Sequence, residues 1–319
     1  PGHYVFHCNT NPGNQNNWGT IIVDGEISGV EEALASNLKV FPNPAQDIIK
    51  IDGNTEGTAE ITDINGKIVE VGSKLVIVSG GVYGSPAILQ RSGIGPEENL
   101  KGIGTKVLSN LPVGKNLMDH PGCAVIFHAP KLSTATGRLF ATNARGPSSA
   151  KLEMEWQVHP FPIGQEEETA GLWIYLPCQD AKGEVLTTST DPKVLPLVDH
   201  AYNTTDSDYR RFKIAWEFCH DLLRTSSFIE YKARSLMNVN QLKEVLAKGI
   251  NSANHQVGTC KMGPARDNTT VVDSRLQVHG ISGLMVADAS IFPEHILHNP
   301  NFTCMVIGEI AADIVTGKF

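Results

Sequence analysis

The strongest constraint on the fold comes from two short apolar runs that lie far apart in the chain. Residues 75–78 read Leu-Val-Ile-Val and are followed by a Gly-Gly pair, and residues 284–287 read Leu-Met-Val-Ala and end at Asp288. A continuously apolar strand is typical of a parallel sheet that is covered on both faces. We therefore predict a mixed α/β (α+β) fold. Asp288 then lies at the carboxyl end of a buried strand, where such folds place ligand-contacting groups.

The segment after the first apolar run carries a helix start signal. Ser85 suits the N-cap and Pro86 the first helical position, where the missing N–H group costs nothing. The predicted helix ends before Ser92-Gly93. A strand–glycine–helix turn exposes backbone N–H groups that suit an anionic or polar cofactor edge. Gly80, Gly81 and Ser85 are therefore candidate cofactor-binding residues.

Composition excludes several classes of protein. The chain has 319 residues, 41% of them apolar and 19% charged, which indicates a globular protein. Its net charge of −8 disfavours nucleic acid as a partner, and no apolar run is long enough to cross a bilayer as a helix. The six cysteines form no Cys-x-x-Cys pair, so we expect no metal site and a few buried free thiols. The start at Pro1 lacks a signal segment and reads as an internal start, and the localisation stays open.

His255 is the candidate catalytic base. A histidine is the side chain best suited to exchange a proton near neutral pH. It opens a turn that contains Gly258 and Thr259, ahead of the second apolar strand. Asn299 follows 44 residues later (299 − 255) and would supply a second polar group to the same site.

The sequence around His255 resembles the C-terminal part of the glucose–methanol–choline (GMC) family of flavin-dependent alcohol oxidoreductases. Five elements of that family occur here in order, at His255–Gly263, Val271–Asp273, Asp288–Pro293, Asn299–Asn301 and Ile307–Asp313. Two further segments resemble the family: 81–95, similar to its second signature although Val82 replaces a small residue, and 111–121, similar to its next segment. The resemblance covers about residues 60–319.

This resemblance implies the oxidation of a small-molecule alcohol by hydride transfer to FAD. His255 would accept the hydroxyl proton and Asn299 would hydrogen-bond the substrate oxygen, while the protein orients the flavin. The residues expected at the cofactor are the following: Gly80, Gly81, Ser85, Asp288, Ala289, Asn299 and Pro300. Asp119 and His120 are also candidates for the site, although His120 is not placed in the catalytic set.

The sequence signature that usually binds the dinucleotide end of FAD is missing from this chain. The chain contains no Gly-x-Gly-x-x-Gly; the nearest match, Gly102-Ile103-Gly104, follows no predicted strand. We therefore predict a partial FAD-binding fold that is incomplete alone: a fragment, a composite, or one of two chains, the second carrying the dinucleotide-binding half. The expected domains are a β-rich segment (1–72), part of the FAD-binding domain (73–123), a substrate domain with an antiparallel sheet (124–250) and a C-terminal catalytic segment (251–319).

Residues 1–72 read as short strands between Gly, Pro and Asn breakers. Asn65-Gly66 is a strong hairpin signal, because both central residues of that turn need positive φ. Residues 1–23 weakly resemble the end of a cupredoxin domain, and residues 37–69 a type IX secretion sorting domain. Copper binding is not expected, because the neighbouring His7 and Cys8 point to opposite faces of a strand.

The middle of the chain names no substrate. Strands are expected at 124–127, 172–176 and 185–188, and a helix at Thr205–Leu223. The apolar residues of this predicted helix fall on one face at spacings of three and four, which indicates a core helix. Two alternatives to the oxidoreductase stay open: a non-catalytic secreted β-domain protein, and a hydroxynitrile-lyase-like enzyme on the same scaffold. A flavin spectrum would distinguish the oxidoreductase from the non-catalytic protein. Reduction of the flavin by substrate would distinguish it from the lyase.

Overall fold

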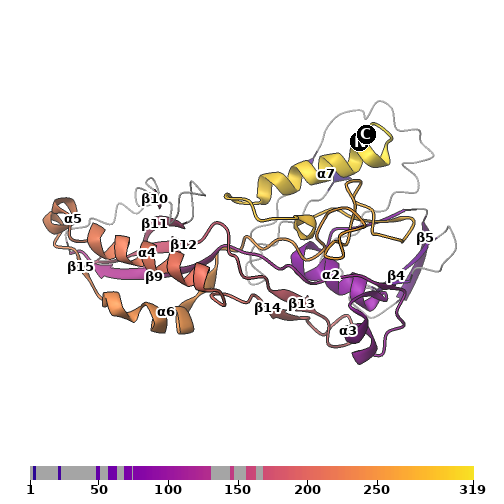
Figure 1. The fold of residues 1–319 in the computed structure, drawn as a ribbon. Helices are drawn as coiled ribbons and strands as arrows, with labels where there is room; N and C mark the ends of the chain where they lie inside the picture. Colours follow the sequence, from indigo (N-terminus) through magenta and orange to yellow (C-terminus); the bar gives the residue numbers. More distant parts are fainter. Residues whose placement is uncertain are drawn as a thin grey trace.

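The computed structural model describes residues 75–130, 156–161 and 168–319, together with the backbone of short strands elsewhere (Figure 1). The strands are β1 (His3–Tyr4), β2 (Ile21–Ile22), β3 (Ile48–Lys50), β4 (Gly57–Thr62), β5 (Ile68–Ser73), β6 (Val76–Val78), β7 (Ile94–Gly95), β8 (Ser109–Asn110), β9 (Pro121–His128), β10 (Ala144–Gly146), β11 (Trp156–Pro162), β12 (Thr169–Tyr175), β13 (Glu184–Leu186), β14 (Leu197–Asp199), β15 (Arg234–Ser235), β16 (Asn251–Ser252) and β17 (Leu284–Val286). The helices are α2 (Gly81–Arg91), α3 (Glu97–Gly102), α4 (Asp206–Leu222), α5 (Ser226–Glu230), α6 (Leu242–Gly249) and α7 (Asn301–Val315), with short 3₁₀ turns η2 (Val239–Gln241) and η3 (Ala289–Ile291). Within these residues, no helix combines the length and the apolar character needed to cross a bilayer.

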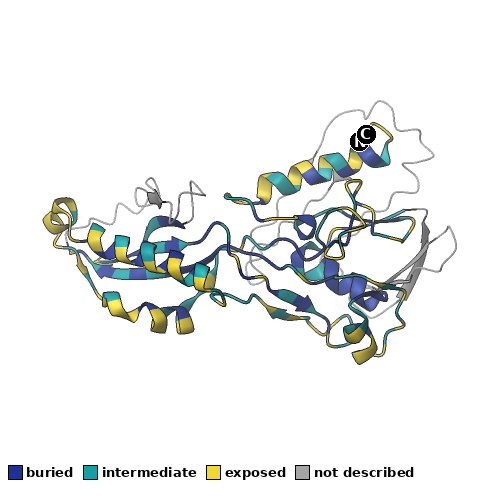
Figure 2. Cartoon of the chain, in the orientation of Figure 1, coloured by how far each residue is buried: buried dark blue, intermediate teal, exposed yellow. Residues whose placement is uncertain are grey.

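The two apolar runs form neighbouring parallel strands, as predicted. Strand β17 pairs with β6 so that Leu284 lies opposite Val76 and Val286 opposite Val78. The pair extends through a hydrogen bond from the Ala287 N–H to the carbonyl of Val78. Residues of β6, α2, β17 and α7 share one buried core, which is the dark-blue region on the right of Figure 2. The mixed α/β fold expected from these runs is confirmed.

Helix α2 begins earlier than predicted. It starts at Gly81, so Ser85 and Pro86 lie inside the helix and Ser85 is not its N-cap. The prediction was wrong because other residues replace the expected cap. The N–H of Gly81 donates to the carboxylate of Asp288 at the end of β17, and the N–H of Gly80 donates to Ser85 Oγ. Two of the backbone groups expected to face a cofactor therefore already have protein partners.

A threonine compensates for the proline inside α2. Pro86 has no N–H group, so the carbonyl four residues earlier, at Val82, loses its helical donor. That carbonyl accepts a hydrogen bond of 2.7 Å from Thr259 Oγ1. Thr259 is fully buried and belongs to the turn that follows His255. The Gly-Thr motif thus completes a helix that starts almost 180 residues earlier in the chain (259 − 82 = 177).

The middle of the chain contains the predicted antiparallel sheet. Six strands take part, in the order β10-β11-β12-β9-β15, with β16 also paired to β9. Alternate residues of β9, Cys123, Val125 and Phe127, face a second buried core that includes residues of α4 and α6. Helix α4 agrees with the predicted helix and its apolar face, and Thr205 caps it by accepting from the Asp208 N–H.

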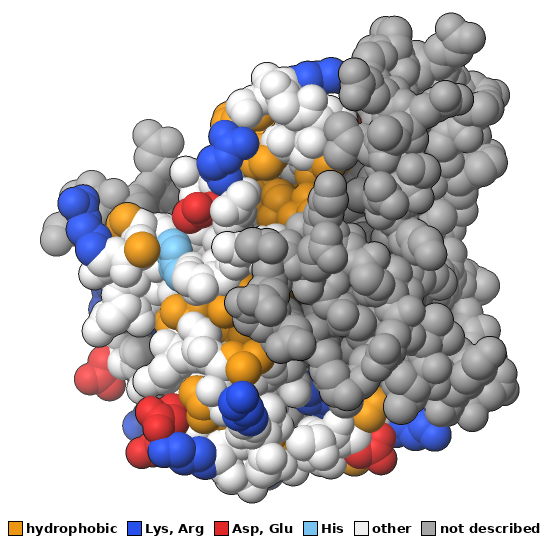
Figure 3. Space-filling model, turned by 90° about the vertical axis from the view of Figure 1, so that its right-hand side faces the viewer, with side chains coloured by type: hydrophobic (Ala, Val, Ile, Leu, Met, Phe, Trp, Pro, Cys, Tyr) orange, Lys and Arg blue, Asp and Glu red, His pale blue; other side chains and the backbone are white. Residues whose placement is uncertain are grey.

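The strands near the N-terminus agree in part with the sequence. Strand β1 pairs with β2, and β3, β4 and β5 form an antiparallel sheet in which Thr62 lies opposite Ile68. The two strands flank Asn65-Gly66 as predicted, but a two-residue turn there would place Thr62 opposite Val69, so the register differs by one residue from the one that turn requires. The turn itself, His7 and Cys8 lie outside the described residues. Figure 3 shows one face of the molecule, on which hydrophobic side chains are exposed between charged ones. The large hydrophobic residues that are exposed in the described part of the chain include Phe302, Met305 and Val306 of α7.

The bond from Thr259 to the Val82 carbonyl predicts a specific stability effect. Thr259→Val leaves that carbonyl unpaired in a buried region, and we expect a loss of about 1–3 kcal/mol in the free energy of unfolding. Thr259→Ser keeps the hydroxyl and should recover most of the loss. Thr188→Val, at an exposed threonine, is the matched control and should change little. Urea unfolding followed by circular dichroism measures all three; a Thr259→Val variant as stable as the parent would refute the role given to this bond.

Candidate active site

A buried carboxylate organises the site. Asp119 precedes strand β9, and its side chain is fully buried. Its Oδ1 accepts from the backbone N–H groups of His120 at 2.7 Å and His255 at 3.1 Å. Its Oδ2 accepts from Tyr202 Oη at 2.5 Å and Gln256 Nε2 at 3.2 Å. Among the described residues no lysine or arginine pairs with it, so these four donors alone compensate for its burial.

His255 is fixed at both its backbone and its ring. Its N–H donates to Asp119, and its carbonyl lies 2.8 Å from His295 Nε2. The ring Nδ1 lies 2.9 Å from the Nδ1 of His120. No hydrogen bond within the described residues reaches the other ring nitrogen, Nε2. Burial lowers the pKa of His255, and the charge of Asp119 partly opposes that shift.

His120 lies between several rings and is buried. Its Nε2 lies 2.9 Å from the carbonyl oxygen of Ile296. Its ring stacks on those of Tyr175, at 5.6 Å between centroids, and His295, at 4.0 Å. Burial, followed by the neighbouring His295, lowers the pKa of His120 to about 2. His120 is therefore a neutral imidazole at physiological pH, able to donate from one nitrogen and accept at the other.

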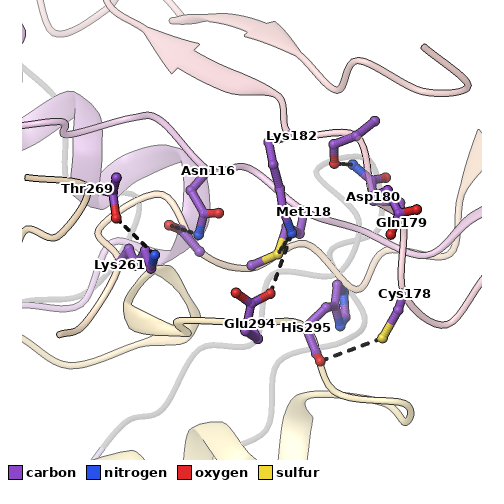
Figure 4. Close-up of polar contacts among 12 residues, drawn as sticks. Asn116, Met118, Cys178, Gln179, Asp180, Lys182, Lys261, Thr269, Glu294 and His295 are labelled. Atoms are coloured by element: carbon purple, nitrogen blue, oxygen red, sulfur yellow. Dashed lines mark hydrogen bonds and ion pairs between the residues drawn. The ribbon is translucent and has the colours of Figure 1, made fainter. Parts of the chain in front are cut away.

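His295 connects the site to the loop before α7. Its Nδ1 lies 2.9 Å from the carbonyl of Ile296, and its own carbonyl is 3.8 Å from Cys178 Sγ (Figure 4). The neighbouring Glu294 lies 3.6 Å from Lys182 Nζ. Burial lowers the pKa of His295, and the carbonyl groups of Ile296 and His255 partly oppose that shift. Contacts on both sides thus hold the loop against the end of β12.

Two tyrosines and a histidine extend the polar network around Asp119. The ring of Tyr202, whose hydroxyl binds Asp119, stacks on His200 at 4.6 Å between centroids. Tyr83 Oη lies 3.3 Å from His200 Nε2. Burial, and next the charge of Asp119, raises the pKa of both phenols, so both remain protonated near pH 7. They serve as hydrogen-bond donors and not as anions.

Asp288 holds the start of α2 to the end of β17. Its Oδ2 accepts from the Gly81 N–H at 2.9 Å and from Ser85 Oγ, and its Oδ1 from the Ser290 N–H at 2.7 Å. Ser85 is fully buried. Gly81 has a φ of +74°, and an added Cβ would meet nothing within 4 Å. The turn therefore requires glycine at this position for its conformation, and it borders open space.

Asn299 and Pro300 lie at the N-terminus of α7. Asn299 is exposed, and its Oδ1 accepts from the Asn301 N–H at 2.9 Å. Pro300 is buried and is the N-cap of the helix. Among the described residues no hydrogen bond joins Asn299 to His255. The structure thus brings His255 together with Asp119, and Asp288 together with Gly81 and Ser85, whereas Asn299 contacts neither group through a hydrogen bond.

The sequence did not reveal the histidine cluster. His120 lies beside a predicted site segment but was not placed in the catalytic set, and His295 carried no signal beyond its position two residues after Pro293. Their contacts with His255 join residues 135 and 40 positions apart. No helical or strand period relates residues at such separations. The Leu-Met-Asp-His-Pro segment at 117–121 was the one available pointer to His120.

Family models of the GMC oxidoreductases match two parts of the chain. The N-terminal model matches residues 29–122 and the C-terminal model residues 179–308. The chain therefore belongs to the GMC oxidoreductase family, as its sequence motifs predicted. The N-terminal match begins ahead of residue 60, where the resemblance was expected to start, and includes residues 37–69. The proposed likeness to a sorting domain is therefore not supported, nor is the likeness of residues 1–23 to a cupredoxin.

Curated relatives include choline-oxidising enzymes. An oxygen-dependent choline dehydrogenase from Rhizobium johnstonii is 29% identical, over 88% of this chain and 58% of its own length. A choline oxidase from Arthrobacter globiformis is 31% identical, over 75% of this chain and 48% of its own length. The chain thus spans about half the length of the curated relatives it matches. These comparisons give no support to a separate second chain.

Solved structures show the same fold. A pyridoxine 4-oxidase from Mesorbium loti superimposes with a TM-score of 0.75 at 25% identity, covering 83% of this chain and 56% of that one. A formate oxidase from Aspergillus oryzae gives a TM-score of 0.71 at 20% identity, covering 86% of this chain and 60% of that one. The second likeness, at this low identity, supports the fold alone.

The buried neutral histidines predict a loss of stability in mild acid. Their folded pKa values lie below the ordinary value of 6.5, so the unfolded chain binds more protons below that pH. Their contribution to stability is complete above pH 6.5 and declines as the pH falls below it. His120 alone, with a folded pKa of about 2, should remove about 1.4 kcal/mol for each pH unit below 6.5.

Urea unfolding at pH 7.5, 6.0 and 5.0 measures this slope. His120→Gln removes one titrating imidazole and should reduce the slope by about that increment of roughly 1.4 kcal/mol per unit. Thr188→Val, which removes no titrating group from an exposed position, is the control and should leave the slope unchanged. An identical slope in the parent and the His120→Gln variant would contradict the assignment of His120 as a buried neutral ring.

Proposed function

We propose that the chain takes part in the FAD-dependent oxidation of an alcohol, with His255 as the general base. The observation that carries this proposal is the state of the His255 ring. Its backbone is fixed by Asp119 and His295 and its Nδ1 by His120, whereas no described residue occupies Nε2. A ring held on one side and free on the other is the arrangement a base needs to meet a substrate hydroxyl.

The protonation chemistry of His255 agrees with this role. Its lowered pKa keeps the ring neutral, and so able to accept a proton, near pH 7. After it accepts the hydroxyl proton at Nε2, the imidazolium lies close to the buried carboxylate of Asp119, whose charge favours that form. Asp119 therefore both orients the base and stabilises the charge that the base acquires.

The residues around the ends of β6 and β17 fit a flavin. Gly81 borders open space, and its positive φ gives a turn without a side chain. The first turn of α7 is exposed and has no side-chain cap beyond the Asn299 bond, so its helix dipole favours negative charge nearby. When bound, FAD supplies the acceptor for the hydride that leaves the alcohol carbon. We propose that Gly80, Gly81 and Ala289 lie against it.

The other candidate residues have different proposed tasks. Ser85 is buried and Asp288 is bonded to three protein donors, so we propose that they shape the turn beside the cofactor. Pro300 would fix the start of α7. Asn299, exposed at that helix start, would donate its amide to the substrate oxygen while its Oδ1 stays on the Asn301 N–H. One amide group can make both contacts.

We further propose how the segments divide the work. Residues 73–123 and 251–319 would form the cofactor side, with His255 and the β6–β17 pair. Residues 124–250 would form the substrate side, because one face of their sheet is covered by α4 and α6 and the other carries Tyr175 and His159 toward His120. Residues 1–72 would lead into the cofactor side.

Flavin spectroscopy tests the proposal. Added FAD should bind and give visible absorption bands that bleach anaerobically with one of a panel of alcohols: choline, pyridoxine and an aryl alcohol. Bleaching should be slower by about 10²- to 10⁴-fold in His255→Ala, which lacks the base. In the parent the rate should reach its plateau near pH 6.5 and fall in acid, because the pKa of His255 lies below 6.5.

The controls separate this reaction from its rivals. His128→Ala, at the far end of β9, should bleach like the parent. A chain that takes up no FAD, or a His255→Ala variant that bleaches at the parental rate, would contradict the proposal. Substrate cleavage without bleaching would indicate a lyase on this scaffold, because a lyase moves the hydroxyl proton without a hydride.

A further inference from the structure

A contact between two histidine rings determines where the proton of His255 lies. The Nδ1 atoms of His120 and His255 face each other at 2.9 Å, with the ring centroids 5.0 Å apart and the planes at 88°. Two nitrogens at this distance share one hydrogen, so one ring donates and the other accepts. Which ring donates follows from the other nitrogen of His120.

The main chain decides the state of His120. Its Nε2 lies 2.9 Å from the carbonyl oxygen of Ile296, and a carbonyl oxygen only accepts, so this nitrogen carries a hydrogen. Burial lowers the pKa of His120 to about 2, so the ring is neutral and carries one hydrogen only. Its Nδ1 is then a lone pair. The hydrogen between the rings therefore belongs to His255.

The His120 ring is not free to turn over and exchange its nitrogens. It is buried and stacks on Tyr175 and His295, with interplanar angles of 22° and 26°. Its backbone N–H is held by Asp119. The alternative ring orientation would move a carbon atom toward Ile296 and break both hydrogen bonds.

We propose that His120 is a positioning residue that fixes the tautomer of His255, holding the hydrogen on Nδ1 and leaving the lone pair on Nε2. The tautomer of a histidine is set by the hydrogen bond that its other nitrogen makes. The order of hydrogen bonds is His255 Nδ1–H to His120 Nδ1, and His120 Nε2–H to the Ile296 carbonyl. The free nitrogen of His255 is thereby the basic one.

The functional meaning of this order rests on the proposed function of His255. The proton of the alcohol hydroxyl moves to the lone pair of His255 Nε2, and the hydrogen on His255 Nδ1 keeps its bond to His120 Nδ1 throughout. The imidazolium that forms keeps its bond to His120, since it still donates from Nδ1. No bond in the cluster must rearrange during the proton transfer, which is what a preorganised base requires.

Nitrogen-15 NMR of the full chain labelled with [¹⁵N]histidine tests the tautomer without any turnover. At pH 7.5 the two ring nitrogens of His255, assigned by comparison with His255→Gln, should show Nδ1 protonated and Nε2 unprotonated. The reverse pattern in the parent protein would overturn the proposal, whatever any variant does.

Two substitutions of His120 separate positioning from packing. In His120→Asn the side-chain oxygen takes the place of Nδ1 as acceptor, so His255 should keep its hydrogen on Nδ1. In His120→Phe a ring of similar shape offers no acceptor, and a measurable fraction of His255 should move to the Nε2–H form. Equal tautomer populations in both variants and the parent would refute the role of His120.

Flavin bleaching gives a second readout that distinguishes the two proposals. His120→Phe should slow bleaching by about 10- to 100-fold, the size of effect that loss of an orienting partner produces, and His120→Asn should recover much of it. If His255→Ala bleaches at the rate of the parent protein, His255 is not the base, although the NMR result on its tautomer still holds. If His120→Phe bleaches at the parental rate while His255→Ala is slow, only the positioning role of His120 is refuted.

Discussion

The buried carboxylate of Asp119 is the interaction on which the rest of the site depends. It accepts hydrogen bonds from three separate parts of the chain: its own segment before β9, Tyr202 ahead of α4, and His255 with Gln256 after β16. A charge buried without a cationic partner is stable only while all its hydrogen bonds are made. The position of His255 is therefore coupled to that of the loop that carries Tyr202, because a shift of either one removes a hydrogen bond from the buried carboxylate.

The turn after His255 has a structural task as well as a chemical one. Thr259 completes the hydrogen bonding of helix α2 across Pro86, and the Gly258 N–H donates to the carbonyl of Ala289 after β17. The same few residues thus hold the base, the helix beside the predicted flavin site and the end of the second parallel strand. This sharing explains in physical terms why a Gly-Thr pair stands so close to the histidine.

The sequence predicted those parts of the molecule that local patterns determine. Strands β6 and β17 follow from apolar runs and helix α4 from helical spacing, and the motifs around His255 identified the family. The start of α2 was wrong because a Ser-Pro cap signal was overridden by Asp288 and Thr259, partners about 200 and 170 residues away (288 − 85 = 203; 259 − 86 = 173). The ring contacts of His120 and His295 were missed for the same reason. Contacts of that range follow from the tertiary fold and leave no period in one sequence.

The pairing of β6 with β17 also has a consequence for how the molecule folds. Val76 and Leu284 pair although they lie 208 positions apart in the chain (284 − 76 = 208). By the logarithmic law of loop closure, bringing such ends together costs about 3 kcal/mol more entropy than closing a ten-residue loop. The antiparallel sheet between them pairs strands that are much closer along the chain, so it has the lower kinetic barrier. We therefore expect the contacts at the end of β17, where Asp288 accepts from Gly81 and Ser85, to form late in folding, because they depend on this long-range closure.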